Sequence, residues 1–186
     1  MTVYSVRLYK ILGNFNQILF IASVVNFSLV NTAWPHTDPL HQIMESRMVQ
    51  LQDPGSLTID GNKIAAHTLI PELYAKRHFT LAWQDANKRD ELFGIISHID
   101  SEGLNPEDYL LQSLLKYHEQ ESQLTDTDRV DFDILLTESL VRLGYHLRFG
   151  KINPKSQYPN WNLNRSLENK DPAAIIQAAI DSYSIR

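Results

Sequence analysis

The chain has 186 residues and a formal net charge of −5, with hydrophobic residues at 43% and charged residues at 21%. This length and balance predict one ordinary globular domain with its own hydrophobic core. Nucleic-acid binding needs a basic face, so the acidic balance and the lack of lysine or arginine runs argue against a nucleic-acid partner. The sequence contains no cysteine, which excludes disulfides, thiolate metal sites and a cysteine nucleophile in this chain.

Residues 1–33 have the layout of an export segment. Arg7 and Lys10 precede the apolar stretch 18–30, and no acidic residue comes before Asp38. A basic start, a short apolar run and then small residues are typical of a secretory signal peptide. A retained membrane anchor and a buried helix of a cytosolic fold are the alternatives. We therefore expect an exported protein, in the periplasm or anchored in the inner membrane facing the periplasm, that meets the membrane only through this segment.

Residues 34–56 are expected to be a linker. Their composition is polar and includes Pro35, Pro39 and Pro54, with one short helix expected around Leu40–Leu51. Prolines near a change of composition are typical of a segment that connects two parts of a chain. The compact domain is accordingly expected to begin after this linker.

The compact domain is predicted to span residues 57–186 and to be all-α, with a few short extended segments. Leu57–Ile59 ahead of Asp60 and Gly61 predicts a short strand and a turn, and His78–Trp83 is expected to be extended as well. Five helices are expected from their caps and apolar spacing: over Ile70–Lys76, from Asp85 to Gly103, from Asn105-Pro106 onward, from Thr125 to Phe149, and from Asp171-Pro172 onward.

Two of these helices carry further expectations. Apolar residues surround more than half of the Thr125–Phe149 helix, which predicts a central position packed on several sides. The last helix reaches almost to Arg186 without a stop signal. The domain is therefore expected to be incomplete at its C-terminus.

No constellation of residues predicts a reaction centre. The closest approach to a zinc-protease motif begins at His118, but Ser122 occupies the position of the second histidine. Two pairs of acids, Glu107-Asp108 and Asp131/Asp133, are interpreted as residues that stabilise helix starts. The sequence therefore predicts no catalytic residue, no metal site and no cofactor.

Three phrases, LIPELYAKRHFTLAW, SEGLNPEDYLL and DFDILLTESLVRLGYHLRFGKINP, occur in the order and at the intervals found in a known family. The matching residues include Tyr74, Arg77, Trp83, Gly103, Leu104, Pro106, Tyr109, Leu136, Thr137, Gly150, Pro154 and Trp161, and Asp133 matches as well. In these residues the chain resembles the N-terminal scaffold domain of the large, multi-domain bacterial L,D-transpeptidases, cysteine enzymes that cross-link peptidoglycan. We interpret most of them as helix starts, helix stops and core aromatics rather than ligand contacts.

The resemblance implies a helical platform that precedes a small peptidoglycan-binding module and a catalytic domain with a Ser/Thr-x-Gly-Cys nucleophile. This chain departs from that pattern because it has no cysteine, so no residue can form the thioester intermediate and the chain itself is expected not to be an enzyme.

We expect a non-catalytic scaffold or docking domain of the cell-wall cross-linking machinery. Its expected partner is a transpeptidase catalytic domain, another cell-wall synthesis protein or peptidoglycan. Two alternatives stay open. One is a truncated or misread fragment of a full L,D-transpeptidase, and the other is an independent peptidoglycan-binding adaptor in which Trp161 stacks on sugar rings.

Overall fold

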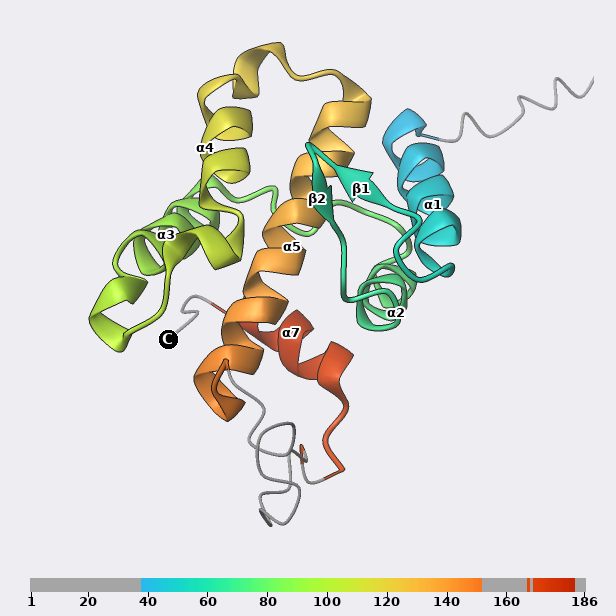
Figure 1. Ribbon diagram of the computed structural model, residues 1–186. Helices are drawn as coiled ribbons and strands as arrows, with labels where there is room; N and C mark the ends of the chain where they lie inside the picture. The colour runs from blue at the N-terminus through green and yellow to red at the C-terminus, as the bar shows by residue number, and fades with distance from the viewer. Residues whose placement is uncertain (1–37, 152–166, 168, 183–186) are drawn as a thin grey trace, which may run out of the picture. The chain divides into compact units, whose positions relative to one another are not determined.

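The computed structural model of the chain describes residues 38–151, 167 and 169–182. These residues form six α-helices and one small two-stranded sheet, which confirms the predicted all-α fold class (Figure 1). The elements are α1 Pro39–Leu51, β1 Thr58–Ile59, β2 Asn62–Lys63, α2 Leu69–Lys76, α3 Ala86–Ser97, α4 Leu111–Glu119, α5 Asp126–Phe149 and α7 Pro172–Asp181, with 3₁₀ turns η1 Ile99–Glu102, η2 Pro106–Tyr109 and η3 Glu121–Gln123. The expected export segment lies outside the described residues. Within them, none of the helices combines the length and the apolar character needed to cross a membrane.

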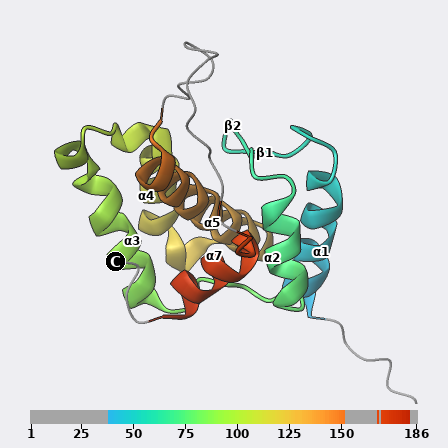
Figure 2. The same ribbon diagram turned by 90° about the horizontal axis from the view of Figure 1, so that it is seen from below.

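Helix α5 is the central element. It begins with a capping box in which the Thr125 hydroxyl accepts a hydrogen bond from the backbone N–H of Asp128, and the Asp128 carboxylate accepts one from the backbone N–H of Thr125. Every residue from Val130 to Leu140 is buried, because α1, α2, α3, α4 and η2 all pack around this part of the helix (Figures 1 and 2). The predicted central position is therefore confirmed.

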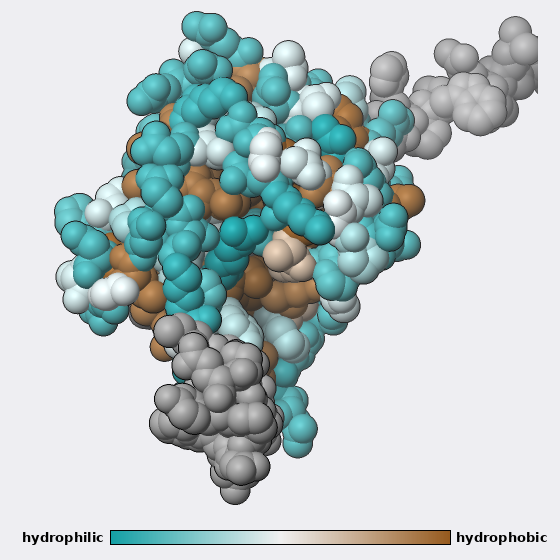
Figure 3. Space-filling view, viewed as in Figure 1, coloured by the Kyte–Doolittle hydropathy of each residue, from teal (hydrophilic) through white to brown (hydrophobic). Residues whose placement is uncertain are grey.

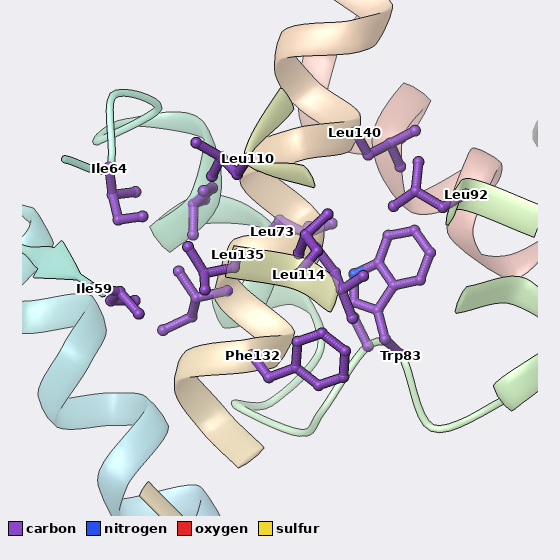
Figure 4. Close-up of a cluster of buried hydrophobic side chains, with 14 of the residues drawn as sticks. Ile59, Ile64, Leu73, Trp83, Leu92, Leu110, Leu114, Phe132, Leu135 and Leu140 are labelled. Atoms are coloured by element: carbon purple, nitrogen blue, oxygen red, sulfur yellow. The ribbon is translucent and has the colours of Figure 1, made fainter. Parts of the chain in front are cut away.

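The hydrophobic core surrounds α5. Trp83, Leu92 and Leu114 pack on one side of it, and Ile59 and Ile64 from the hairpin region lie on the other (Figure 4). All five side chains are at most 2% exposed. The core therefore joins residues that lie far apart in the sequence through a single helix.

Helix α1 belongs to this core, although the sequence assigned its residues to a linker. Met44, Met48 and Leu51 are buried and face α5. Their i, i+4, i+7 spacing gives one narrow apolar stripe on an otherwise polar helix, so the overall composition of the segment concealed it. The folded part of the chain therefore begins before residue 57.

The strand and turn predicted at Leu57–Gly61 are confirmed, and the structure adds a second strand, β2, that pairs with the first. Strands β1 and β2 pair antiparallel, with Asp60 and Gly61 in the turn at φ values of 47° and 76°. Two consecutive positive φ values are typical of the two-residue turns that join antiparallel strands.

The prediction of an extended His78–Trp83 segment is wrong at its start. His78 and Phe79 both adopt left-handed conformations, and the N–H of Phe79 donates to the carbonyl of Tyr74 while that of His78 donates to Ala75. This pair of bonds is the Schellman motif, which satisfies the last carbonyls of a helix. The chain therefore turns sharply at the end of α2 before it runs on to Trp83.

Two predicted helices are each divided in the structure. The helix expected from Asp85 to Gly103 ends at Ser97 and continues as η1, and Gly103 (φ 73°) ends that turn. The helix expected after Asn105-Pro106 is split into η2 and α4 by Leu110, which is left-handed (φ 62°) and 6% exposed. Burial of the Leu110 side chain offsets the cost of a conformation that branched or bulky residues seldom adopt.

Candidate functional site

Three buried acidic residues on α5 bind three other parts of the fold. Asp131, Asp133 and Glu138 are 9%, 3% and 0% exposed. Acidic side chains are almost never this buried unless they are paired or hydrogen-bonded. Their partners therefore show what α5 organises.

Asp133 binds the segment that follows α2. Its Oδ1 accepts hydrogen bonds from the Tyr74 hydroxyl (2.6 Å) and the Ala82 N–H (2.9 Å), and its Oδ2 accepts one from the Trp83 N–H (2.8 Å). Thr137, one turn further along, accepts a bond from Trp83 Nε1 (3.0 Å) and shares another with the Tyr74 hydroxyl (2.8 Å). These contacts fix the positions of both aromatic side chains against α5.

Burial raises the pKa of two groups in this network, the Asp133 carboxyl and the Tyr74 hydroxyl. Removal from water raises the pKa of Asp133 above its usual range, although the hydrogen bonds from Tyr74, Ala82 and Trp83 act in the opposite direction. The pKa of Tyr74 is raised well above its usual value by burial first and then by the Asp133 charge. The hydroxyl therefore stays protonated and remains a donor to the carboxylate.

Glu138 binds the segment between β2 and α2. Its carboxylate accepts the backbone N–H groups of Ala65 (3.0 Å) and Ala66 (3.1 Å) and forms an ion pair with Arg142 (2.6 Å). Arg142 in turn donates to the carbonyl oxygen of Lys63 (2.9 Å). One acid and one base on successive turns of α5 thus fix the hairpin and the chain that leaves it.

Asp131 binds α1. Arg47 donates two hydrogen bonds to its carboxylate, from Nε to Oδ1 at 2.8 Å and from Nη2 to Oδ2 at 2.9 Å. Burial raises the pKa of Asp131, while the Arg47 hydrogen bonds lower it in part. A two-point guanidinium contact fixes orientation as well as distance, so it sets how α1 lies on the central helix.

Helix α7 is bound from α2 and α3. Arg77 forms an ion pair with Asp181 (2.8 Å), Lys76 pairs with Asp171, and Lys88 donates to the carbonyl oxygen of Ile180. The hydrogen bond between Lys76 and Asp171 lowers the pKa of the Asp171 carboxyl and raises the pKa of the Lys76 amine. Basic residues therefore contact both the first and the last turn of α7, which Figure 2 shows beside α2.

The structure brings together only some of the residues singled out in the sequence. Tyr74, Trp83 and Thr137 meet in the Asp133 network, and Arg77 contacts α7. Tyr109 is buried, and its hydroxyl hydrogen-bonds His146 Nδ1 at 3.1 Å. The others take separate structural places: Leu136 in the core, Leu104 packed against it, Pro106 at the start of η2, and Gly103 and Gly150 as the ends of η1 and α5. Pro154 and Trp161 lie outside the described residues.

Sequence reasoning missed the roles of the acids on α5. The sequence pattern indicates only favourable charges near a helix start for Asp131 and Asp133, and it assigns no role to Glu138. These acids lie within an almost continuous apolar stretch of the sequence. A buried acid needs a hydrogen-bond donor, so this position indicates a buried donor beside each of them. The donors themselves are mostly backbone N–H groups at distant positions, which no local pattern reveals.

An apolar groove lies where the end of α5, α7 and the start of α2 meet. Its volume is about 650 Å³, and its walls include Val141, Tyr145 and Phe149 from α5, Leu69 from α2, and Ile175 and Ile176 from α7. Figure 3 shows hydrophobic residues gathered in a recess at this place. Among the described residues, no group of three or more histidines, cysteines or acids could bind a metal ion. The groove is therefore suited to apolar contact.

The family comparison agrees with this picture of a framework. A family model described as Scaffold domain matches residues 68–186, which is more than half of the chain and runs from α2 to α7. No catalytic domain is recognised, and the sequence contains no cysteine. No curated protein and no solved structure matches the chain. The chain belongs to the Scaffold domain family.

Proposed function

We propose that this scaffold domain supports peptidoglycan cross-linking by binding an L,D-transpeptidase catalytic domain in the cell envelope. The observation that carries the proposal is the family match over α2 to α7, together with the three phrases that resemble the scaffold of those enzymes. Because the chain contains no cysteine, the proposal leaves the chemistry to another polypeptide or to another part of a longer one.

The described residues provide what a docking platform needs. Buried anchors at Asp131, Asp133 and Glu138 fix α1, the Trp83 segment and the hairpin on α5. Binding surfaces on a rigid framework lose little conformational entropy on association. The apolar groove at the end of α5 offers a contact surface on this framework.

Export belongs to the same proposal. The basic residues Arg7 and Lys10 ahead of the apolar stretch 18–30 support delivery across the inner membrane. Replacing several apolar residues of that stretch by aspartate is expected to leave the protein in the cytoplasm. Fractionation of cells that carry an epitope-tagged full chain would measure this, and unchanged export of the variant would refute the role of the segment.

Binding in solution tests the central part of the proposal. The full chain is titrated with a purified L,D-transpeptidase catalytic domain by calorimetry, and with purified sacculi by co-sedimentation. We expect saturable binding of the catalytic domain. Binding to sacculi alone would instead favour the peptidoglycan adaptor, and binding to neither by a chain with native helical content would refute the proposal.

A further inference from the structure

We propose that the apolar groove between α5, α7 and α2 binds an amphipathic helix with acidic flanks from a partner protein. The inference rests on the proposed function and specifies the partner surface that the scaffold takes. It depends on three observations among the described residues: an open apolar groove, a glycine on its floor and two cations at its rim.

The groove is lined by one continuous stripe of α5. Val141, Gly144, Tyr145, Arg148 and Phe149 line it, at the i, i+3, i+4, i+7, i+8 spacing of a single helix face. Ile175, which is 40% exposed, and Ile176 line it from α7. Helix α7 packs on α2, and its residues Ile175 and Ile176 line the groove opposite the end of α5. A groove between helices with this shape is the usual receptor for an amphipathic helix.

Gly144 lines the groove and leaves room for a partner helix to approach α5. It is an exposed residue inside α5, and a Cβ atom added there would meet no heavy atom within 4 Å. Packing among the described residues therefore does not require glycine at this position, although glycine inside a helix costs about 0.5–1 kcal/mol relative to alanine. Its effect is to leave the floor of the groove without a side chain, which allows the backbone of a partner helix to approach.

Charge at the rim selects the partner. Arg148 and Lys170 line the groove and form no ion pair with any described residue, although the Arg148 guanidinium lies 5.9 Å from the Phe149 ring. The acid that also lines the groove, Glu72, is paired with Lys76 at 3.2 Å. Among the described residues, the rim therefore carries two cations without an ion pair, on a chain whose overall charge is −5. Acidic residues beside the apolar face of a partner would complement it.

The test uses two peptides of about 15 residues, the length at which a helix begins to form in water. Both have leucines on one helix face, and one carries glutamates at the flanks where the other carries lysines. Fluorescence anisotropy of each labelled peptide is measured against the full chain. We expect the acidic peptide to bind at least about tenfold more tightly, with a difference that shrinks at high salt.

A matched pair of glycine substitutions assigns the binding to the groove. Gly144→Met fills the floor and is expected to weaken binding of the acidic peptide by about tenfold or more. Gly94→Met on α3 is the control, because Gly94 is also an exposed helix glycine with open space around it. Neither variant is expected to lower the thermal unfolding midpoint, since methionine favours the helix more than glycine does. Arg148→Glu combined with Lys170→Glu is expected to reverse the preference between the two peptides.

Three results would overturn the inference. These are equal binding of the acidic and basic peptides, equal binding of the acidic peptide by Gly144→Met and the unmodified chain, and binding of phosphatidylglycerol vesicles in place of the acidic peptide. The catalytic-domain titration is repeated with Gly144→Met to separate this inference from the proposed function. Equal binding of the catalytic domain by both chains refutes the groove alone, whereas peptide binding without catalytic-domain binding refutes the proposed partner alone.

Discussion

The charge of the buried Asp133 carboxylate is stabilised by hydrogen-bond donors. For a buried acid, an ion pair would be expected instead. Within the described part of the chain, one hydroxyl and two backbone N–H groups donate to this carboxylate. Such donors stabilise a buried charge without bringing a second charge out of water. Tyr74 and Trp83, two of the residues singled out in the sequence, are thus placed by a buried acid of α5.

Asp133→Ala is expected to destabilise the protein by at least about 2 kcal/mol, because the buried N–H groups of Ala82 and Trp83 would lose their acceptor at about 1–3 kcal/mol each. Urea unfolding followed by circular dichroism measures the change. Asp90→Ala is the control, since Asp90 is exposed on α3, and it should stay within about 0.5 kcal/mol of the unmodified chain. Similar losses in the two variants would contradict the role assigned to Asp133.

Asp60 is expected to contribute stability at neutral pH that is lost in acid. Hydrogen bonds from Lys116 and Ser113 lower the pKa of its carboxyl in the folded state, so the folded chain binds that proton less readily than the unfolded chain. The contribution is therefore complete above the unfolded pKa of about 3.9 and disappears as the pH falls through the lower folded value. Asp60→Asn should be less stable than the unmodified chain at neutral pH, by up to about 1 kcal/mol. This gap in unfolding free energy should close in acid, and a gap that widens there would contradict the assignment.

At the scale of elements, the end of α5 depends on Gly150. Its φ and ψ of 76° and 154° lie in a region reached almost only by glycine. A Cβ atom at this position would meet nothing within 4 Å, so backbone strain alone should decide the effect of a substitution. Gly150→Ala is expected to cost about 1–3 kcal/mol in unfolding free energy, whereas Gly94→Ala should be neutral or stabilising by up to about 1 kcal/mol. Equal effects of the two substitutions would show that the conformation at Gly150 is not strained for alanine.

The attachment of α7 gives a second prediction at this scale. Removing the Arg77 guanidinium breaks the ion pair with Asp181, so Arg77→Ala should open α7 without unfolding α5. Hydrogen exchange followed by mass spectrometry should show exchange in α7 about fivefold faster, which corresponds to about 1 kcal/mol. Arg129→Ala, which replaces an exposed residue of α5, should leave α7 unchanged. Uniformly faster exchange in both helices would mean that Arg77 stabilises the whole fold.

The sequence predicted the helices that carry their own local markers. The Thr125–Asp128 capping box, the Asp171-Pro172 helix start and the Asp60-Gly61 turn depend on side chains close to the element that they define, and all three are confirmed. The division at Leu110 and the core position of α1 depend on contacts with distant residues, and local patterns did not reveal them. The groove was not predicted for the same reason, since its walls come from three separate helices.

At the scale of the molecule, the structure describes a framework built on one helix. Each buried acid of α5 contacts a different neighbour, and basic residues of α2 and α3 bind α7. This arrangement fixes the relative positions of segments from Met44 to Ile180.

The most direct test of the account measures cross-link formation. A purified L,D-transpeptidase catalytic domain is incubated with isolated peptidoglycan, with and without the full chain, and cross-linked products are quantified by chromatography after digestion. The account predicts that the chain alone forms no cross-links, that it raises the rate of the catalytic domain, and that Asp133→Ala loses this effect. An unchanged rate in the presence of a chain with native helical content would contradict the account.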